Sequence, residues 1–454
     1  MNVFFYLSCT IMNVYYGQTF GACAVKEELY MKKLIALLIA MTLLLGVGAV
    51  AAQAEDIHLI MAWWGNQARN ETYNAILDTY AEQNEGVTFD TQFVAWDDYW
   101  KKLATAAAGH TLPDIILMDY AYMTQYQENN LLADLTDYVN SGVLDLSQIN
   151  QGIVDSASSD GKIYAVCSNI NAPALFYNKT LLDANGIEVK DYMTMEDFIA
   201  VSKEVYEKTG YKTNFAYACN QPLDYILRGI GHNLFTDGKF TASKEDLELY
   251  YGYFEQGIKE GWMLGSDTYA EINVSTVEQN PMVYGTDPER MSWCTFLWSN
   301  QMIALQNAAP EGMEVGVTTW PSADNKASNY LKPGGFFAVT TDSKNPEEAA
   351  KVINYLTNDI ETGIKLAAIG TMAPAANVAE AVMPTLSEIS KKATEYVNNV
   401  VTPNCSALPE AEPDGANEFF AKKNEIEEQL CYGVMDAKTA AEELVAFGEQ
   451  LFNK

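Results

Sequence analysis

Residues 161–182, GKIYAVCSNINAPALFYNKTLL, carry the strongest local indication of how this chain is organised. Two short apolar runs, at 164–166 and 174–177, flank the small polar joint SNINAP at 168–173, and a helix start follows. A joint between two apolar runs, far from both ends, is a place where a chain leaves one compact body and enters another. This stretch therefore predicts a domain boundary.

Length and charge support two domains and exclude some partners. The chain has 454 residues, more than one ordinary core accommodates, and 48% of them are hydrophobic, as in a folded protein. The formal net charge is -32, from 28 basic and 60 acidic residues. Such a surface repels nucleic acid and anionic membranes, so we expect no nucleic-acid partner.

The amino-terminal segment has the features of a secretory signal peptide. A basic start, MKK at 31–33, precedes an apolar run at 34–52, and AQA at 52–54 supplies the small residues that signal peptidase requires. We expect cleavage before Glu55. An uncleaved transmembrane helix is the alternative, but the acidic pair that follows the run argues against it.

Residues 1–30 have no basic segment and no clear period. We therefore expect them to lie upstream of the true start, and residues 31–54 to be the signal peptide.

Strand and helix patterns alternate after residue 55. Strands are predicted at 57–63, 87–94 and 113–119. Helices are predicted at 71–84, 96–108, 122–140, 195–209, 246–259 and 437–451. This alternation is typical of an α/β fold with a parallel sheet.

Two of these helices allow more than one interpretation. Asp97 and Asp98 could form a catalytic carboxylate pair, but capping of the helix at 96–108 explains them more simply. The tyrosine-rich face at 250–254 could be a binding platform, although core packing is the more common role of such a face.

Ligands of α/β sheets bind beyond the carboxyl ends of the strands. The predicted ends here are WWGN at 63–66, Trp96, and Asp119 with Tyr120, all rich in aromatic and polar groups. In the pair Trp63-Trp64, one ring should face the core and the other a ligand, because side chains alternate along a strand.

Five short motifs resemble the extracellular solute-binding proteins of ABC importers, the family that includes maltose-binding and other sugar-binding members. They are GKIYA at 161–165, YNK at 177–179, MTMEDF at 193–198, WSN at 298–300 and SKNPEEA at 343–349. Each motif alone is weak, but their order and spacing together are specific. The resemblance extends from about residue 31 to the carboxyl terminus.

The resemblance implies a two-lobed α/β fold of the periplasmic-binding-protein type II (Venus-flytrap) class. Its hinge crossovers would lie near 168–174 and 330–336, with a third near 374–386. Lobe I would combine residues 55–168 with 336–380, and lobe II residues 169–335 with 381–454. Family members in single-membrane bacteria often have a lipid-bearing cysteine at the cleavage site, but Glu55 stands there, so we find no lipobox cysteine.

The implied function is capture of a carbohydrate, more specifically an oligosaccharide, by hinge closure and its delivery to the permease subunits of an ABC transporter. We expect a secreted monomer, periplasmic or at the cell surface, without a cofactor. One alternative is the same fold with a polyamine, a phosphorylated compound or a peptide as its solute. Another is a secreted glycan-acting enzyme.

Sugar binding requires aromatic faces for the C–H surfaces of the rings and fixed polar groups for the hydroxyls. Trp298 is the strongest candidate, and core packing is the alternative role for every tryptophan. The full set of predicted ligand-binding residues is Trp63, Trp64, Asn66, Trp96, Asp119, Tyr120, Asn171, Gln221, Tyr225, Trp298, Asn300, Trp320, Gly335 and Phe336. The chain has three arginines, Arg69, Arg228 and Arg290, and none lies on the strongest candidate loops, which fits a neutral ligand.

Neither catalysis nor a metal site is predicted. The chain lacks GxSxG, HExxH, P-loop and Rossmann glycine motifs in the right context. Its seven cysteines form no CxxC, and its three histidines are scattered. Whether Cys405 and Cys431 pair is left open by the sequence.

Overall fold

The computed structural model describes residues 56–65, 67–272 and 276–453, without the side chain of Asp97. The predicted leader and Asn66 lie outside the described residues. Residues 57–454 form one unit by their mutual contacts. None of the described helices is long and apolar enough to span a membrane.

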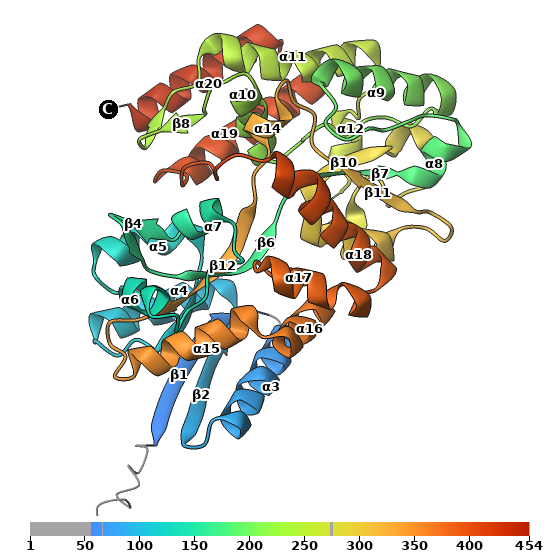
Figure 1. Cartoon of the computed structure of the whole chain (residues 1–454). Coiled ribbons are helices and arrows are strands. Elements are labelled where there is room, and N and C mark those ends of the chain that lie inside the picture. The colour runs from blue at the N-terminus through green and yellow to red at the C-terminus, as the bar shows by residue number, and fades with distance from the viewer. Residues whose placement is uncertain (1–55, 66, 273–275, 454) are drawn as a thin grey trace, which may run out of the picture. The chain divides into compact units, whose positions relative to one another are not determined.

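The larger sheet of the described chain is mixed (Figure 1). Its strand order is β2 (Val87–Val94), β1 (Ile57–Trp64), β3 (Ile115–Met118), β12 (Lys332–Val339) and β6 (Val166–Asn171). Strands β2, β1 and β3 are parallel, as the strand–helix alternation predicts. Strand β12 is antiparallel to both of its neighbours, β3 and β6.

Helices connect and surround this sheet. They are α3 (Gln67–Gln83), α4 (Trp96–Ala108), α5 (Tyr120–Glu128), α6 (Thr136–Asn140), α7 (Gln151–Asp155), α15 (Pro346–Asn358), α16 (Ile360–Ala368) and α17 (Ala376–Val382). A small hairpin, β4 (Ser158–Ser159) with β5 (Lys162–Ile163), precedes β6.

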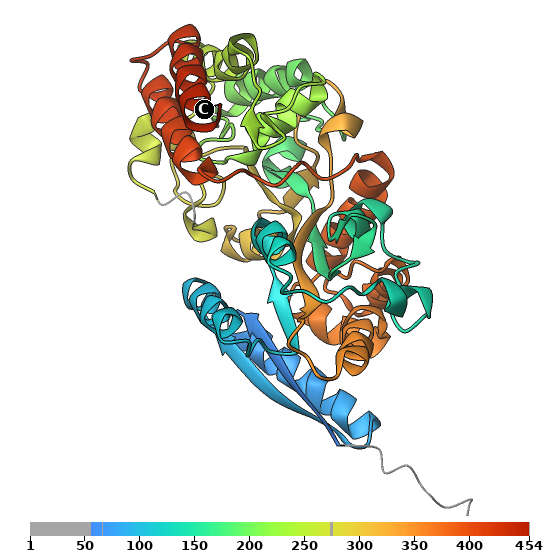
Figure 2. The same ribbon diagram turned by 90° about the vertical axis from the view of Figure 1, so that its left-hand side faces the viewer.

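The smaller sheet is antiparallel, with the order β10 (Cys294–Trp298), β7 (Pro173–Asn178) and β11 (Val315–Thr318). Its surrounding helices are α8 (Lys179–Ala184), α9 (Met195–Thr209), α10 (Gln221–Gly229), α11 (Lys244–Glu260), α12 (Ser266–Tyr269), α13 (Met302–Ala308), α14 (Asn325–Ser328), α18 (Glu388–Glu395), α19 (Ala416–Cys431) and α20 (Ala437–Phe452). A hairpin, β8 (Phe235–Thr236) with β9 (Lys239–Phe240), follows α10. Helices α19 and α20 lie side by side in both views, and α20 packs on α11 (Figure 1 and Figure 2).

The two sheets are joined closely along the chain. Strand β6 ends at Asn171 and β7 begins at Pro173, so a single residue, Ala172, separates strands of different sheets. Strand β12 runs beside β6, with Lys332 opposite Asn171, and its register shifts around Gly335.

Gly334 lies at this irregularity, where its backbone approaches β6. A Cβ atom added there would lie 2.1 Å from Asn169 Nδ2, so a larger residue has no room unless Asn169 moves.

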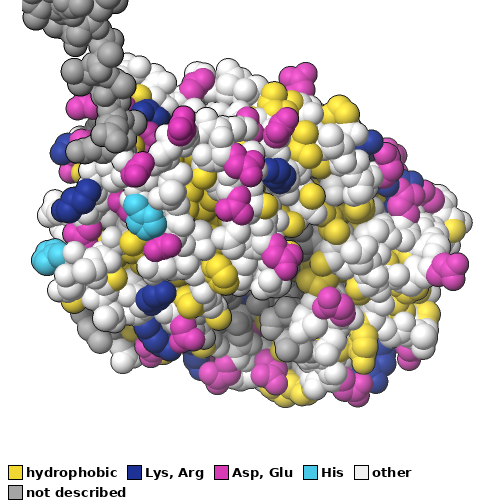
Figure 3. Space-filling view, turned by 90° about the horizontal axis from the view of Figure 1, so that it is seen from below, with side chains coloured by type: hydrophobic (Ala, Val, Ile, Leu, Met, Phe, Trp, Pro, Cys, Tyr) yellow, Lys and Arg dark blue, Asp and Glu magenta, His cyan; other side chains and the backbone are white. Residues whose placement is uncertain are grey.

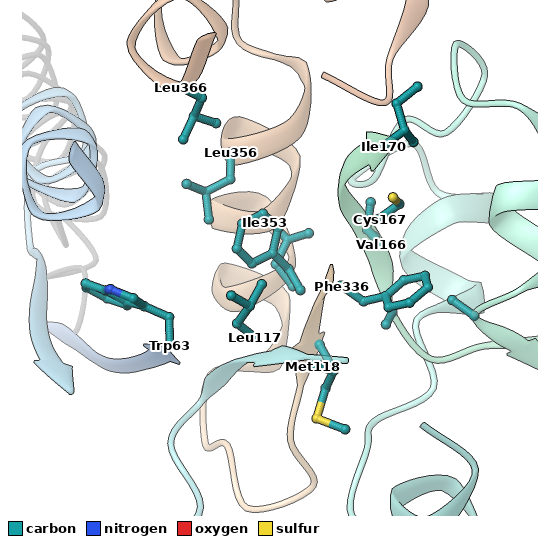
Figure 4. Packing of buried hydrophobic residues seen from close by; sticks show 14 of the residues in the cluster. Trp63, Leu117, Met118, Val166, Cys167, Ile170, Phe336, Ile353, Leu356 and Leu366 are labelled. Atoms are coloured by element: carbon teal, nitrogen blue, oxygen red, sulfur yellow. The ribbon is translucent and has the colours of Figure 1, made fainter. Parts of the chain in front are cut away.

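Buried apolar side chains fill both sides of the larger sheet. All four residues of β3 are buried, which explains its continuous apolar sequence. Figure 4 shows Leu117 and Met118 of β3 packed near Phe336 of β12 and Val166 of β6. A second cluster packs α9, α10, α11, α19 and α20 against the smaller sheet.

The amino-terminal ends of α9 and α4 differ in their caps. At the start of α9, Thr194 and Asp197 form a capping box, in which each side chain accepts a hydrogen bond from the other residue's backbone amide. Capping of α4 by Asp97 or Asp98 was wrong, because α4 begins at Trp96 and its N-cap, Ala95, offers no side-chain hydrogen bond.

The predicted helix at 122–140 was also wrong, because the structure has two helices, α5 and α6, in this stretch. Asn130 between them has a left-handed φ of 54°, and Leu132 forms a bridge to Thr340.

The surface charge and the cysteines of the described chain are as follows. Acidic side chains are interspersed with fewer basic ones over the face in Figure 3. All five cysteines of the described chain are free, so Cys405 and Cys431 are not paired in this structure. The described residues also contain no group of histidine, cysteine and carboxylate side chains that could hold a metal ion.

Candidate functional site

The loop after β3 supplies the first part of the site. Because β1, β2 and β3 are parallel, their carboxyl ends lie at one edge of the sheet. Asp119 follows β3 and caps α5, with its Oδ1 accepting a hydrogen bond from the Ala121 amide at 3.0 Å. Tyr120, the first residue of α5, packs near Phe336 with ring centroids 6.3 Å apart.

Four predicted residues line one hollow of about 200 Å³, which we call the cleft hollow. Asp119 and Tyr120 come from the loop after β3, Gln221 from the first turn of α10 and Trp298 from the end of β10. The hollow thus brings together side chains attached to both sheets, as a ligand site between two lobes requires.

The cleft hollow also contains residues that were not predicted. They are Tyr330, Lys332, Pro333, Ala121 and the segment 408–412. Lys332 belongs to the segment 330–336, which the family resemblance predicts as a crossover, so its position in a site could have been inferred. Residues 408–412, LPEAE, match no motif, and only the tertiary fold brings them here.

Trp298 lies in an aromatic group with a cation on its face. Its ring centroid is 5.8 Å from that of Trp320 and 6.2 Å from that of Tyr330. The Lys332 ammonium nitrogen lies 4.5 Å from the Trp298 centroid, within the range of a cation–π interaction. Trp298 itself is only half-buried, so its ring remains accessible from the hollow.

Carboxylates dominate the charge of the cleft hollow. Among the described residues, Asp119, Glu410 and Glu412 line it together with one cation, Lys332. Burial, and then the nearby Glu410 carboxylate, raise the pKa of Tyr120. Neighbouring protein atoms displace water from the Glu412 carboxyl group and so raise its pKa, although the residue as a whole is exposed. The Lys332 ammonium opposes this shift.

Two further hollows adjoin the cleft hollow, and Gln221 lines all three. One, of about 500 Å³, also shares Trp298, and none of the described residues that line it is charged, so we call it the uncharged hollow. The other, of about 460 Å³, also shares Tyr330 and contains Arg228. The Arg228 guanidinium donates hydrogen bonds to Ser406 Oγ and the Ala407 carbonyl, each at 2.6 Å, so an arginine does lie beside the site.

Comparison with known proteins identifies the family. A sequence profile described as "Bacterial extracellular solute-binding protein" matches residues 75–396, well over half of the chain. The chain belongs to this family.

Individual relatives of this solute-binding protein are distant. The "Carbohydrate ABC transporter substrate-binding protein" of Streptococcus pneumoniae is 23% identical over 298 residues, which are 62% of this chain and 57% of that protein. The match therefore spans little more than half the length of this relative.

Solved structures show the fold. An extracellular solute-binding protein family 1 member from Alicyclobacillus acidocaldarius has a TM-score of 0.78 at 20% identity, covering 88% of this chain and 100% of that one. A periplasmic oligogalacturonide-binding protein from Yersinia enterocolitica has a TM-score of 0.71 at 16% identity, covering 87% and 99%. The two-lobed type II α/β fold predicted for this solute-binding protein is confirmed.

Four predicted aromatic contacts of this solute-binding protein lie in the core instead. Trp63 is 0% exposed, with its Nε1 donating to Asn70 Oδ1 at 2.9 Å, and Trp320 is 1% exposed. Tyr225 is fully buried, with its hydroxyl 2.6 Å from Asn329 Oδ1, and Phe336 packs inside the larger sheet. None of the four lines the hollows described above, because their side chains are buried in the apolar clusters.

Trp64 faces away from Trp63, as strand alternation predicts. Its ring packs edge-to-face on Trp96 at 4.9 Å, and Trp96 is 40% exposed. Neither ring is part of the cleft hollow or of its two neighbours.

The remaining predicted residues are polar or glycine. Asn300 is exposed and lines a different hollow, of about 600 Å³, with Gly65 and Asn169. Asn171 is buried in β6, and its Oδ1 has no hydrogen-bond partner among the described residues. Gly335 is buried within β12 and does not line the cleft hollow.

Proposed function

We propose that this solute-binding protein captures an oligosaccharide in the cleft hollow and delivers it to the permease subunits of an ABC importer. The observation that supports this most is the meeting of Trp298 and Tyr120 with Asp119 and Gln221 in one hollow between the two sheets. A pneumococcal relative is named for carbohydrate and a Yersinia structural neighbour for oligogalacturonide, and both names support the same ligand class.

The chemistry of the hollow suits a sugar. The exposed part of the Trp298 ring offers a face for the C–H surface of a pyranose. The Gln221 amide and the Asp119 carboxylate offer acceptors and donors for hydroxyl groups at fixed positions. The uncharged hollow beside Trp298 provides room for a second sugar unit, which favours an oligosaccharide over a monosaccharide.

Binding would act through hinge closure. Lobe I would comprise residues 55–168 and 336–380, and lobe II residues 169–335 and 381–454, with crossovers near 168–174, 330–336 and 374–386. A ligand that contacts both lobes only when they are closed shifts the population to the closed state, which the permease then recognises. The pairing of Lys332 with Asn171 supports this proposal, because segments from two of the proposed crossovers are neighbours in one sheet.

We further propose binding without catalysis by a secreted monomer. The signal peptide at 31–54 would direct export to the periplasm or the cell surface, and no cofactor would take part.

Calorimetric titration of the chain from residue 55 onward tests the ligand class. The panel is maltotriose, cellotriose, arabinotriose and trigalacturonic acid, with tryptophan fluorescence as a second readout. We expect saturable heat and a fluorescence change with at least one of them. A folded protein that gives no signal with any glycan would overturn the proposal.

Spermidine belongs in the same titration. The carboxylates of Asp119, Glu410 and Glu412 around the hollow favour a cationic solute as the second candidate. Binding of spermidine but of no glycan would establish this alternative. Release of products from a polysaccharide would instead indicate a glycan-acting enzyme.

A further inference from the structure

The loop at 214–220 leads directly into Gln221, the residue shared by all three adjoining hollows. It contains two alanines in left-handed conformation, Ala216 with φ of 51° and Ala218 with φ of 55°. A residue with a Cβ atom adopts this conformation at a cost in free energy, so such residues persist only where surrounding contacts hold them. The loop therefore needs an anchor outside its own sequence.

A fully buried ion pair on α19 supplies that anchor. Lys423 Nζ and Glu427 Oε1 are 2.6 Å apart, and both side chains are 0% exposed. Glu427 Oε2 accepts a hydrogen bond from the Ala218 amide at 3.1 Å, and Lys423 Nζ donates to the Cys219 carbonyl at 3.0 Å. Two successive loop residues are thus held by two charges one helical turn apart.

Tyr250 contacts both members of the ion pair but makes no hydrogen bond to the loop backbone. The Tyr250 hydroxyl of α11 donates to Glu427 Oε1 at 2.8 Å, and the Lys423 ammonium lies 5.9 Å from the Tyr250 ring centroid. Asn424, next to Lys423 in sequence, lines the uncharged hollow together with the loop.

A buried ion pair is weak evidence for a role in stability, because apolar residues of similar volume often replace such a pair without loss. Apolar residues, however, cannot bind an amide and a carbonyl of the loop. The contacts that distinguish this pair from apolar packing are therefore its two hydrogen bonds to Ala218 and Cys219.

We propose that Lys423 and Glu427 are positioning residues of the ligand site: they hold the strained loop at 214–220 and thereby place Gln221 and the loop wall of the uncharged hollow. The ligand-binding part of this inference rests on the proposed function. The positioning part concerns the loop alone.

Hydrogen exchange tests the positioning directly and needs no ligand. In the double variant Lys423→Met/Glu427→Leu, the Ala218 amide loses its acceptor, and we expect exchange across 214–221 to rise about tenfold. Tyr250→Phe is the matched control, because it removes a hydrogen bond to Glu427 but neither loop contact, so exchange in the loop should stay unchanged. Unchanged loop exchange in the double variant, or an equal rise over the whole chain, would overturn the proposal.

A second double variant covers the case in which the first does not fold. Lys423→Met/Glu427→Gln keeps a side-chain oxygen for the Ala218 amide, so loop exchange should rise less than in the Met/Leu variant. A rise confined to 214–221 supports the positioning role, and no rise there contradicts it.

Affinity provides the functional readout. For whichever glycan of the calorimetric panel binds the wild-type chain, we expect about tenfold weaker binding in Lys423→Met/Glu427→Leu and partial recovery in Lys423→Met/Glu427→Gln. Full affinity together with a mobile loop would overturn the link to the site. If the wild-type chain binds no glycan, the proposed function fails, while hydrogen exchange still decides the positioning of the loop.

Discussion

The ammonium nitrogen of Lys332 lies over the face of Trp298, 4.5 Å from the ring centroid. Lys332 begins β12 and pairs with Asn171 at the end of β6, beside the connection between the two sheets. The cation therefore lies over an aromatic face of Trp298, and it does so from a strand that we propose as a crossover. A ligand that stacks on this same face of Trp298 has to displace the ammonium group.

Replacement of Lys332 by methionine should uncover this face. A partly exposed cation–π contact contributes about 0.5–1 kcal/mol, so Lys332→Met should tighten binding of a neutral oligosaccharide about two- to fivefold in calorimetry. Lys332→Arg, which retains a cation, serves as the control and should bind like the wild type. Weaker binding by Lys332→Met would show that the ammonium contacts the ligand instead.

Two neighbouring tryptophans should respond oppositely to alanine. Trp298→Ala should lower glycan affinity at least about tenfold with little change in stability, because the ring is half-buried and lines the cleft hollow. Trp320→Ala should lower the free energy of unfolding by about 3–5 kcal/mol, because this ring is 1% exposed. Denaturant unfolding and calorimetry on both variants provide the test, and the same loss of affinity without destabilisation at both positions would refute the distinction.

The Tyr225 hydroxyl should matter for folding but not for the ligand. It lies 2.6 Å from Asn329 Oδ1 and 3.1 Å from the Trp320 carbonyl oxygen, inside the core. Tyr225→Phe should therefore cost about 1–3 kcal/mol in urea unfolding and leave glycan affinity unchanged. A loss of glycan affinity without a loss of stability would show that Tyr225 contacts the ligand.

Gly334 and Asn169 should behave as a coupled pair. An alanine Cβ at position 334 would lie 2.1 Å from Asn169 Nδ2, so Gly334→Ala should lower the free energy of unfolding by about 1–3 kcal/mol. Adding Asn169→Ala removes the obstructing amide and should restore most of that loss, which a double-mutant cycle measures. Additive effects of the two substitutions would mean that Asn169 is not the obstacle.

Acid should weaken the fold partly through Glu260. Hydrogen bonds from Lys203, and then from Trp262 and Gln256, lower the pKa of Glu260 from 4.5 to about 2. Below pH 4.5 the unfolded chain takes up this proton before the folded chain does, so the stabilisation present above pH 4.5 is lost as the pH falls towards 2. Glu260→Gln should make unfolding free energy less steeply dependent on pH in this window, and an unaltered slope would contradict the shift.

Local patterns predicted the elements whose signals are local. Strand β2 (Val87–Val94) and helix α9 (Met195–Thr209) have the predicted bounds, because alternation and a capping box are complete within a few residues. The division of 122–140 into two helices coincides with the left-handed φ of Asn130 and with the bridge from Leu132 to Thr340, a residue far away in the sequence.

The site was predictable only in part for the same reason. Motif resemblance led to Trp298, and strand ends led to Asp119 and Tyr120. The choice of Trp63 or Trp64 depends on which face of β1 meets the core, and the pattern left it open. The segment 408–412 lines the hollow through packing that has no sequence signal of its own.

The position of β12 has a consequence for the time course of folding. This strand lies between β3 and β6, yet it follows β6 by the whole segment that forms the smaller sheet. Until a nascent chain extends through Val339, β3 and β6 each keep an open edge, and contacts between such distant segments form slowly. A chain truncated before β12 should therefore aggregate rather than form half of the protein, and for an exported precursor the delay would postpone compaction until most of the chain has crossed the membrane.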